Sequence, residues 1–362
     1  MGSGAGGTGS GFIDGVNSGG MTQSGGSTAT MNGGGGSSSV GGSVGDGGSI
    51  SQGGNSVEEP AGGDVQGHPD PNKMYPVYDG FSLYLVEEFD SPLDLNNDPI
   101  WTWNDGQVLD SITRFSEDGI SFQDGKMMIT LRDQPIGETP TRSGEFRTRS
   151  NAYRYGLYVV RYKPPNQEPV NGQFPNFLST MFTYRTPGSQ EWQEVDFELL
   201  GDQRNGVTTN VIMVDGGSVW SLDIEDAVRM FPSGPGAESL PGDFDHGDGE
   251  FHELMFEVLP EQIRWWVDGA LIRVRTPNTL KTNGGSGEIL FPDRSMKIMM
   301  NLWQSDSSWA GNVAATQYPL VAEYDWFRFY KWDGDDQYPC EPLPNCLSPE
   351  DVDENRNNAK DN

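Results

Sequence analysis

The sequence contains only two cysteines and three histidines among its 362 residues. That scarcity excludes a disulfide-dense scaffold and a zinc site built from Cys and His. Basic residues are also few, with 23 Lys and Arg against 53 Asp and Glu and a formal net charge of −30 at pH 7. A chain of that charge repels phosphates, so we expect no nucleic-acid partner and no attraction to an anionic membrane. Apolar runs of roughly 18 residues or more are absent, so we expect no membrane insertion.

Aromatic side chains are what the sequence has in quantity, with 10 Trp, 12 Tyr and 17 Phe. Aromatic faces stack on apolar C–H surfaces, which include the faces of sugar rings. An acidic, aromatic-rich chain therefore favours an uncharged polymer as its ligand.

Composition divides the chain into three parts. Residues 1–72 contain about half of the 49 glycines, and Phe12 is their only aromatic residue. Such a segment buries too little apolar surface to offset the entropy of ordering it, so we expect a disordered Gly/Ser-rich leader. Residues 333–362 form a polar tail, in which we expect Cys340 and Cys346 to form a small local disulfide, with two free thiols as the alternative.

The middle part, residues 73–332, has the pattern of one all-β domain. Short runs rich in Val, Ile, Tyr and Phe recur between clusters of Gly, Asp, Asn and Pro, and several runs alternate apolar and polar residues. Asp268-Gly269 lies between two such runs and predicts a hairpin turn. Because long helical patterns are absent, we expect an antiparallel sandwich or jelly roll.

The segment EWQEVDFELLG, residues 191–201, is the most informative. Alternate residues of a strand share a face, so Glu194, Asp196 and Glu198 line one side. Three like charges there repel each other, which a purely structural strand has little reason to accept. Four steps of ~3.3 Å put the outer α-carbons about 13 Å apart, and inward-leaning carboxyls then come within roughly 5–6 Å. Retaining glycosidases hold their two carboxyls about 5–5.5 Å apart. A solvated acidic strand is the alternative.

Aromatic residues accompany the acidic strand in the sequence. Phe182 and Tyr184 share a strand face, Trp192 precedes the carboxylates, and Trp303 and Trp309 flank a turn. Each of them alone is typical of a protein core. Together with a carboxylate face they predict a groove in which sugar rings stack.

The acidic segment also resembles a known signature. Glu194-Val195-Asp196-Phe197-Glu198 is similar to the E-x-D-x-E motif of glycoside hydrolase family 16, and within that family to the bacterial licheninases, which are endo-β-1,3-1,4-glucanases. The segments GEFRTRSNAYRYGLYVVRYKP, FLSTMFTYR, QIRWWVDG, KIMMNLW and LVAEYDWFRFY resemble licheninase segments in the same order, over roughly residues 78–332. The resemblance implies a jelly-roll β-sandwich of two curved antiparallel sheets with a concave substrate cleft.

The resemblance also implies roles for individual residues. Glu194 would be the nucleophile, Asp196 the assisting residue and Glu198 the general acid/base. Motif positions add substrate-binding residues to Trp192 and Trp309: Glu145, Arg147, Phe182, Tyr184, Asn210, Asn301 and Trp303. Asp325 matches a ligand of a structural Ca²⁺, helped by the backbone carbonyls of Glu88 and Gly125, since this hard cation prefers oxygen ligands. An ordinary strand carboxylate is the alternative for Asp325.

The sequence departs from the licheninase pattern at several positions. Two cysteines of that pattern are missing, one near Arg114-Phe115-Ser116-Glu117 and one where this chain has Ser143, so the disulfide between those segments is absent. The pattern's subsite Asn near the first segment is also replaced, and Ile212 stands where a Tyr is expected. The stretch 215–249 is longer than in compact licheninases and rich in Gly, Pro and Asp, which predicts a rim loop.

The function expected from these features is a secreted, monomeric endo-β-glucanase that hydrolyses mixed-linkage β-glucan with retention, without a catalytic cofactor. No signal peptide is visible, yet a Gly/Ser leader is typical of a protein at the cell surface. One alternative keeps the mechanism and changes the substrate to β-1,3-glucan or galactan, or the reaction to transglycosylation. The other is a non-catalytic carbohydrate-binding jelly roll, which would have no need of three adjacent carboxylates.

Overall fold

The computed structural model describes residues 57–107, 111–188, 191–215, 218–224, 240, 244–277 and 291–335. The chain divides into two units, Met1–Ile50 and Ser51–Asn362, and all of the described residues belong to the second. Cys340, Cys346 and their expected disulfide lie outside the described residues, as do the leader up to residue 56 and most of the expected rim loop. No helix within the described ranges is long and apolar enough to cross a membrane.

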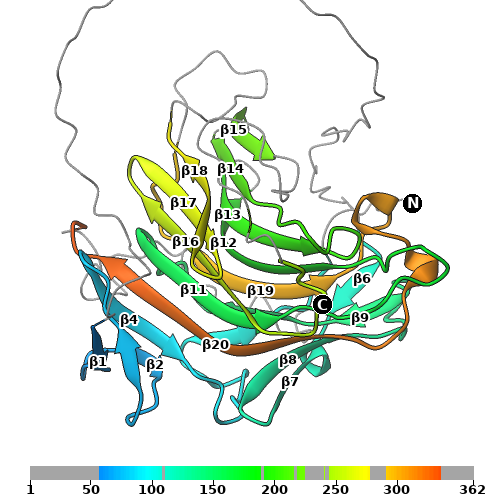
Figure 1. Ribbon diagram of the computed structural model, residues 1–362, viewed down its shortest axis with the longest axis horizontal. Helices are drawn as coiled ribbons and strands as arrows, with labels where there is room; N and C mark the ends of the chain where they lie inside the picture. The colour runs from blue at the N-terminus through cyan, green and yellow to red at the C-terminus, as the bar shows by residue number, and fades with distance from the viewer. Residues whose placement is uncertain are drawn as a thin grey trace, which may run out of the picture. The chain divides into compact units, whose positions relative to one another are not determined.

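Two large sheets contain most of the strands of the described residues (Figure 1). The seven-stranded sheet is antiparallel and runs in the order β15 (Ser218–Ile224), β14 (Asn210–Asp215), β13 (Glu191–Leu200), β12 (Leu178–Gly188), β19 (Lys297–Trp303), β10 (Glu145–Thr148) and β5 (Trp101–Trp103). The nine-stranded sheet has the order β18 (Ala270–Arg275), β17 (Gln262–Val267), β16 (His252–Leu259), β11 (Gly156–Lys163), β20 (Leu320–Trp332), β4 (Phe81–Glu87) and β2 (Gln66–His68). On it, β8 (Lys126–Leu131) also pairs with β20, and β7 (Ile120–Gln123) pairs with β8.

Shorter elements complete the described structure. β1 (Glu58–Pro60) pairs with β3 (Met74–Pro76), and β6 (Thr113–Phe115) pairs in parallel with β9 (Thr141–Ser143). The 3₁₀ turns are η1 (Glu117–Gly119), η2 (Ser308–Ala310) and η3 (Val313–Ala315). The many antiparallel strands and the curved sheets in Figure 1 confirm the all-β jelly-roll sandwich that the alternation and the resemblance predict.

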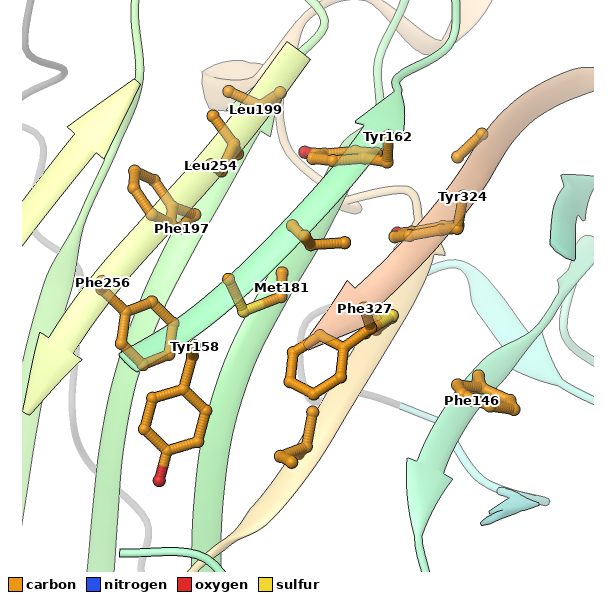
Figure 2. Packing of buried hydrophobic residues seen from close by; sticks show 14 of the residues in the cluster. Phe146, Tyr158, Tyr162, Met181, Phe197, Leu199, Leu254, Phe256, Tyr324 and Phe327 are labelled. Atoms are coloured by element: carbon orange, nitrogen blue, oxygen red, sulfur yellow. The ribbon is translucent and has the colours of Figure 1, made fainter. Parts of the chain in front are cut away.

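The core lies between the two sheets. Figure 2 shows Phe146, Met181, Phe197 and Leu199 of the seven-stranded sheet facing Tyr158, Tyr162, Leu254, Phe256, Tyr324 and Phe327 of the nine-stranded sheet. Tyr162 stacks on Tyr324 with ring centroids 4.9 Å apart and Tyr158 stacks on Phe256 at 4.8 Å. Burial of each large apolar side chain contributes about 1.5–3 kcal/mol, so this face of each strand is fixed by the core.

The hairpin predicted at Asp268-Gly269 is confirmed. β17 ends at Val267 and β18 begins at Ala270, so the two residues form the whole connection. Both have positive φ, 47° for Asp268 and 79° for Gly269, as a type I′ turn requires.

The expected disorder up to residue 72 extends too far along the chain. β2 pairs in parallel with β4, matching Gly67 with Val86 and His68 with Glu87. His68 Nδ1 lies 2.8 Å from Oε2 of Glu87, whose side chain is buried, and His68 Nε2 lies 3.6 Å from Oδ2 of Asp98. The expectation considered only apolar burial, whereas backbone pairing and ion pairs order this segment.

The polar tail also begins in an ordered state. β20 ends at Trp332, as the proposed boundary requires, but the next residues are held by specific contacts. Ser82 Oγ donates to Asp333 Oδ1 at 2.6 Å, and Arg154 donates to both carboxylate oxygens of Asp335. Residues 333–335 therefore belong to the domain.

Gly67 provides a test of the contact between β2 and β4. Its φ is +82°, and a Cβ there would lie 2.1 Å from the carbonyl oxygen of Val86. We expect Gly67→Ala to lower the free energy of unfolding by about 1–3 kcal/mol, measured by chemical denaturation. Gly62→Ala is the control, because a Cβ there meets nothing within 4 Å. Equal stability of the two variants would contradict the docking of β2.

Candidate active site

The seven-stranded sheet turns one face away from the core, and we call this the open face. Strand pairing sorts its side chains into three rows. The first row is Glu145, Asn301, Thr180 and Glu198; the second is Arg147, Met299, Phe182 and Asp196; the third is Lys297, Tyr184, Glu194 and Ile212. Neighbouring rows are two residues apart on each strand, so all of these side chains share one face.

The three acidic residues of β13, here called the trio, lie on the open face. Asp196 is 2% exposed, and Glu194 and Glu198 are half-buried. The intervening Val195 and Phe197 are buried in the core. The alternation in the sequence thus predicts the orientation of the trio, and the core on the other face of β13 enforces it.

Asn210 holds the carboxylate of Asp196 in place. Its Nδ2 lies 3.0 Å from each carboxylate oxygen, and its backbone N–H donates to Oδ1 at 2.8 Å. Glu194 pairs with Ile212 and Glu198 with Thr208, so Asp196 would exchange backbone hydrogen bonds with Asn210 in a regular ladder. Instead, the side-chain carboxylate of Asp196 accepts the hydrogen bond from the Asn210 N–H. Asn210, expected to bind substrate, is 5% exposed and lies against Asp196.

Glu194 has a donor of its own. The indole Nε1 of Trp192 donates to Oε2 of Glu194 at 2.7 Å. Trp192 is 37% exposed, so the bond forms at the edge of the open face. A hydrogen bond to a carboxylate orients it and favours its charged form.

Burial raises the pKa of each carboxyl in the trio. The pKa of Asp196 rises to about 6, held down by its bonds with Asn210 and by the charge of Arg273. The pKa of Glu198 rises to about 8, because the charge of Asp196 adds to the effect of burial. The pKa of Glu194, which shares a hydrogen bond with Asp196, is raised well above its ordinary value by burial and by the neighbouring charges. The trio therefore retains protons near neutral pH and titrates as a unit.

A buried polar network continues the first row away from Glu198. Asn301 Nδ2 donates to Oε2 of Glu145 at 2.9 Å, and Thr180 Oγ1 donates to Oδ1 of Asn301 at 2.6 Å. Burial raises the pKa of Glu145, while the charge of Arg147 acts in the opposite direction. Polar groups fixed in this way present defined donors and acceptors to the hydroxyl groups of a ligand.

The expected aromatic residues lie on both sides of the trio. The rings of Phe182, Tyr184 and Trp192 form a chain with centroid separations of 6.2 Å. Trp303 pairs with Leu178 of β12, one row beyond Thr180, and its ring lies 6.4 Å from that of Trp309. Trp309 is 45% exposed. A sugar polymer can therefore stack on both sides of the carboxylates.

Comparison with known proteins agrees with this geometry. A family model described as "Glycosyl hydrolases family 16" matches residues 109–327. The chain belongs to glycosyl hydrolase family 16. It is therefore a glycoside hydrolase, as the acidic motif predicts.

Two relatives and one more distant structure illustrate the relationship. The chain is 29% identical over 257 residues to a beta-glucanase of Paenibacillus polymyxa, covering 68% of this chain and 90% of that protein. A solved beta-glucanase of Bacillus licheniformis is 25% identical with a TM-score of 0.51, covering 68% of this chain and 97% of that one. A laminarinase catalytic domain of Thermotoga maritima MSB8 has a TM-score of 0.54 at 19% identity, covering 70% and 99%, and shows the fold alone.

The departures from the licheninase pattern can now be placed within this family 16 domain. Ser143 pairs with Phe115 in the small parallel sheet of β6 and β9, and its carbonyl oxygen accepts from Ser116 N–H at 2.9 Å. Backbone pairing thus joins the two segments that a disulfide joins in the pattern. Ile212 is 8% exposed in the row of Glu194, so the open face is apolar where the pattern has Tyr.

The calcium site expected at Asp325 stays a prediction, and the side chains as they lie do not fit it. Asp325 sits at a bulge of β20 opposite Arg161 and Tyr162, and its carboxylate accepts a hydrogen bond from Arg161. In the described part of the chain, no group of three or more His, Cys, Asp or Glu is placed to hold a metal. Ca²⁺ binds about six to eight oxygen ligands. The positive charge of the Arg161 guanidinium, which contacts Asp325, would also repel a Ca²⁺ ion bound between Asp325 and the expected carbonyl ligands of Glu88 and Gly125.

Sequence reasoning missed several residues of the open face. Thr180 lies on the same strand face as Phe182 and Tyr184, and Lys297 lies on the same face as Asn301. The two-residue alternation of a strand is therefore enough to predict both positions. Other residues that contact the trio come from the nine-stranded sheet, and no local pattern indicates them.

A chelator tests the Asp325 site. Because Arg161 already neutralises Asp325, we expect EDTA to leave the Tm of the wild type unchanged to within about 1 °C. In Arg161→Gln the carboxylate loses its cation, and added Ca²⁺ should raise the Tm of this variant only. A fall of several degrees in the wild type on chelation, restored by Ca²⁺, would instead support calcium at Asp325.

Proposed function

We propose that this family 16 enzyme is a retaining endo-glycosidase that hydrolyses β-glucan, with mixed-linkage β-1,3-1,4-glucan as its substrate. The observation that carries the proposal is the trio: three coupled carboxylates on one strand of the open face, whose pKa values are raised to different extents. Two carboxyls on the same strand, four residues apart, suit the short separation that covalent catalysis requires.

The first step divides the work between the two glutamates. Glu198, which keeps its proton because of burial and the charge of Asp196, protonates the glycosidic oxygen as the C–O bond breaks. The carboxylate of Glu194, oriented by Trp192, forms an ester with the anomeric carbon. Glu194 attacks as the carboxylate, the form that its hydrogen bond from Trp192 favours, while Asp196 stays ionised beside Glu198.

The second step reverses the roles of the first. Glu198, now ionised, takes a proton from water, and the resulting hydroxide attacks the anomeric carbon. The ester to Glu194 breaks, and the proton from water remains on Glu198 for the next cycle. Two inversions at the anomeric carbon give net retention.

The surroundings of the trio support a neutral polymer as substrate. Aromatic rings lie before and after the carboxylates, so chain segments on both sides of the scissile bond can be held, as endo cleavage requires. The beta-glucanase names of the relatives from Paenibacillus polymyxa and Bacillus licheniformis favour a glucan. Because such a polymer is too large to enter a cell, we expect the enzyme to act outside the cell or on its surface. One open face carries the whole trio, so we expect a monomer.

Substitution of the nucleophile tests the reaction. We expect the wild type to release reducing ends from barley β-glucan faster than from laminarin or galactan, with the β-anomer appearing first in ¹H NMR spectra. Glu194→Gln should lower turnover roughly 10⁴-fold or more, because it removes the group that forms the covalent intermediate. Glucan binding and the Tm should change little.

Two controls separate the roles in this test. Glu261→Gln removes an exposed carboxylate at the β16–β17 turn and should be as active as the wild type. Glu198→Gln should still release the phenol of an aryl β-glucoside in a burst, because this leaving group needs no protonation, and the ester should then accumulate because Glu198 no longer activates water. Glu194→Gln should show no burst. Turnover of Glu194→Gln within tenfold of wild type would contradict the mechanism. If the wild type cleaves none of the glucans, the proposed substrate is wrong.

Asp196 should control the pH at which Glu198 loses its proton. Burial and the anionic form of Asp196 together raise the pKa of Glu198 to about 8, so Asp196→Asn, which removes the second cause, should lower that pKa. Glu198 then loses its proton at a lower pH, and the alkaline limb of the kcat/KM profile moves to lower pH, with turnover reduced by about 10²-fold. Asp79→Asn, at an exposed turn, is the control. An unmoved alkaline limb in Asp196→Asn would show that Asp196 does not act on Glu198.

A further inference from the structure

Two side chains of the nine-stranded sheet cross the core to the backbone behind the trio. Nε1 of Trp265 on β17 donates to the carbonyl oxygen of Asp196 at 3.0 Å. Arg273 on β18 donates from Nη1 to the carbonyl oxygen of Thr209 at 3.0 Å and to the Thr209 hydroxyl. Trp265 is 1% and Arg273 3% exposed, so both bonds form in the interior.

The acceptors of these hydrogen bonds are carbonyl groups that have no backbone donor among the described residues in the irregular strand pairing around β14. The Asn210 N–H goes to the carboxylate of Asp196, so the Asp196 carbonyl loses its expected partner on β14, and Trp265 supplies a donor. Thr209 lies beyond the Asn210–Ile224 pair, the end of the β14–β15 ladder in the described residues. Its carbonyl receives Arg273 instead. Buried carbonyl groups without a donor are costly, so each contact stabilises the unusual arrangement of Asp196.

A bulge is what turns Arg273 inward. Trp265 pairs with Arg273 and Trp266 with Leu271, so Ile272 is an extra residue on β18. The bulge shifts the alternation, and Arg273 then shares the inner face with Trp265. Without the bulge, the two-residue alternation would place the side chain of Arg273 on the same face as that of Leu271, a residue that is only half-buried.

The charge of Arg273 also acts on the trio. A buried guanidinium is costly unless negative charge compensates it. The groups that face Asp196 are Glu194 and Glu198 from its own strand, Phe182 from β12, Asn210 from β14, and Trp265 and Arg273 from the other sheet. Arg273 is the cation of this set, and its charge lowers the pKa of Asp196.

We propose that Arg273, with Trp265 beside it, is a positioning residue of this hydrolase: it holds the Thr209–Asn210 backbone, thereby fixes the carboxylate of Asp196, and supplies a buried cation behind the trio. Arg273 does not lie on the open face, so it acts on the trio without touching the sugar. The activity arm of its test rests on the proposed glucan hydrolysis; a second arm does not.

The first arm measures activity against pH. We expect Arg273→Met to lower kcat on β-glucan about tenfold or more with little change in KM, since the substitution is remote from bound sugar. Because the lost cation favoured ionised Asp196, the acid limb should move to higher pH by roughly half a unit or more. Arg273→Lys keeps the charge, so its acid limb should stay near that of the wild type, although kcat falls. Trp265→Phe should lower kcat without moving the acid limb.

Arg275→Met is the matched control. Arg275 is a second buried arginine on β18, also facing inward, and it donates to the carbonyl oxygen of Val274 rather than to Thr209. We expect its substitution to lower the Tm as a lost buried arginine would, but to leave the acid limb in place. If Arg273→Met and Arg275→Met have the same pH profile, Arg273 is only structural. If Arg273→Met does not fold, Arg273→Gln takes its place: the neutral side chain should move the acid limb to higher pH while Arg273→Lys does not, and an acid limb unmoved in Arg273→Gln overturns the proposal.

The second arm needs no substrate. The ¹³C carboxyl resonance of Asp196, assigned with Asp196→Asn, reports its ionisation directly. We expect its midpoint in Arg273→Met to lie above that of the wild type, and its midpoint in Arg275→Met to be unchanged. A midpoint unmoved in Arg273→Met overturns the proposal even if the enzyme cleaves glucan. A shifted midpoint supports it even if β-glucan is not the substrate.

Discussion

Three carboxylates on one face of a single strand are the constraint on which the rest of this structure depends. In a largely buried sheet they repel each other and lose hydration, so each needs a proton, a donor or a nearby cation. Asn210 provides three hydrogen bonds to Asp196, and Trp192 provides one to Glu194. Glu198 retains a proton because its pKa rises to about 8. The environment thereby gives chemically similar groups different protonation states, which acid/base and nucleophilic work on one bond requires.

The nine-stranded sheet supports this arrangement as much as the seven-stranded sheet that carries the trio. Tyr324 of β20 donates to the carbonyl oxygen of Thr180 at 3.1 Å, directly below the first row of the open face. Trp265 and Arg273 reach the backbone at Asp196 and Thr209. A close-packed core allows little movement of such donors. The apolar layer between the sheets therefore does more than stabilise the fold, because it fixes the positions of groups on the open face.

Much of the site could be predicted, because strand alternation and stacking surfaces leave local marks in the sequence. The orientation of the trio follows from period two, and the Asp268-Gly269 turn follows from its need for positive φ. The order of residues 57–72 could not be predicted from composition, since it depends on a sheet edge offered by β4. The ion pair at Asp325 was equally hidden, because its partner Arg161 lies on another strand.

Alternation along a strand is a local property of extended backbone, so the order of the residues alone predicts which side chains share a face. It therefore placed Glu194, Asp196 and Glu198 together. The groups that surround these three carboxylates depend instead on contacts between distant segments. Asn210 is 14 residues from Asp196 and Trp265 is 69 residues from it, and strand order and register bring both into contact with it. Arg273 points inward only because a bulge at Ile272 shifts the alternation of β18, and a bulge depends on pairing between strands, which no single segment contains.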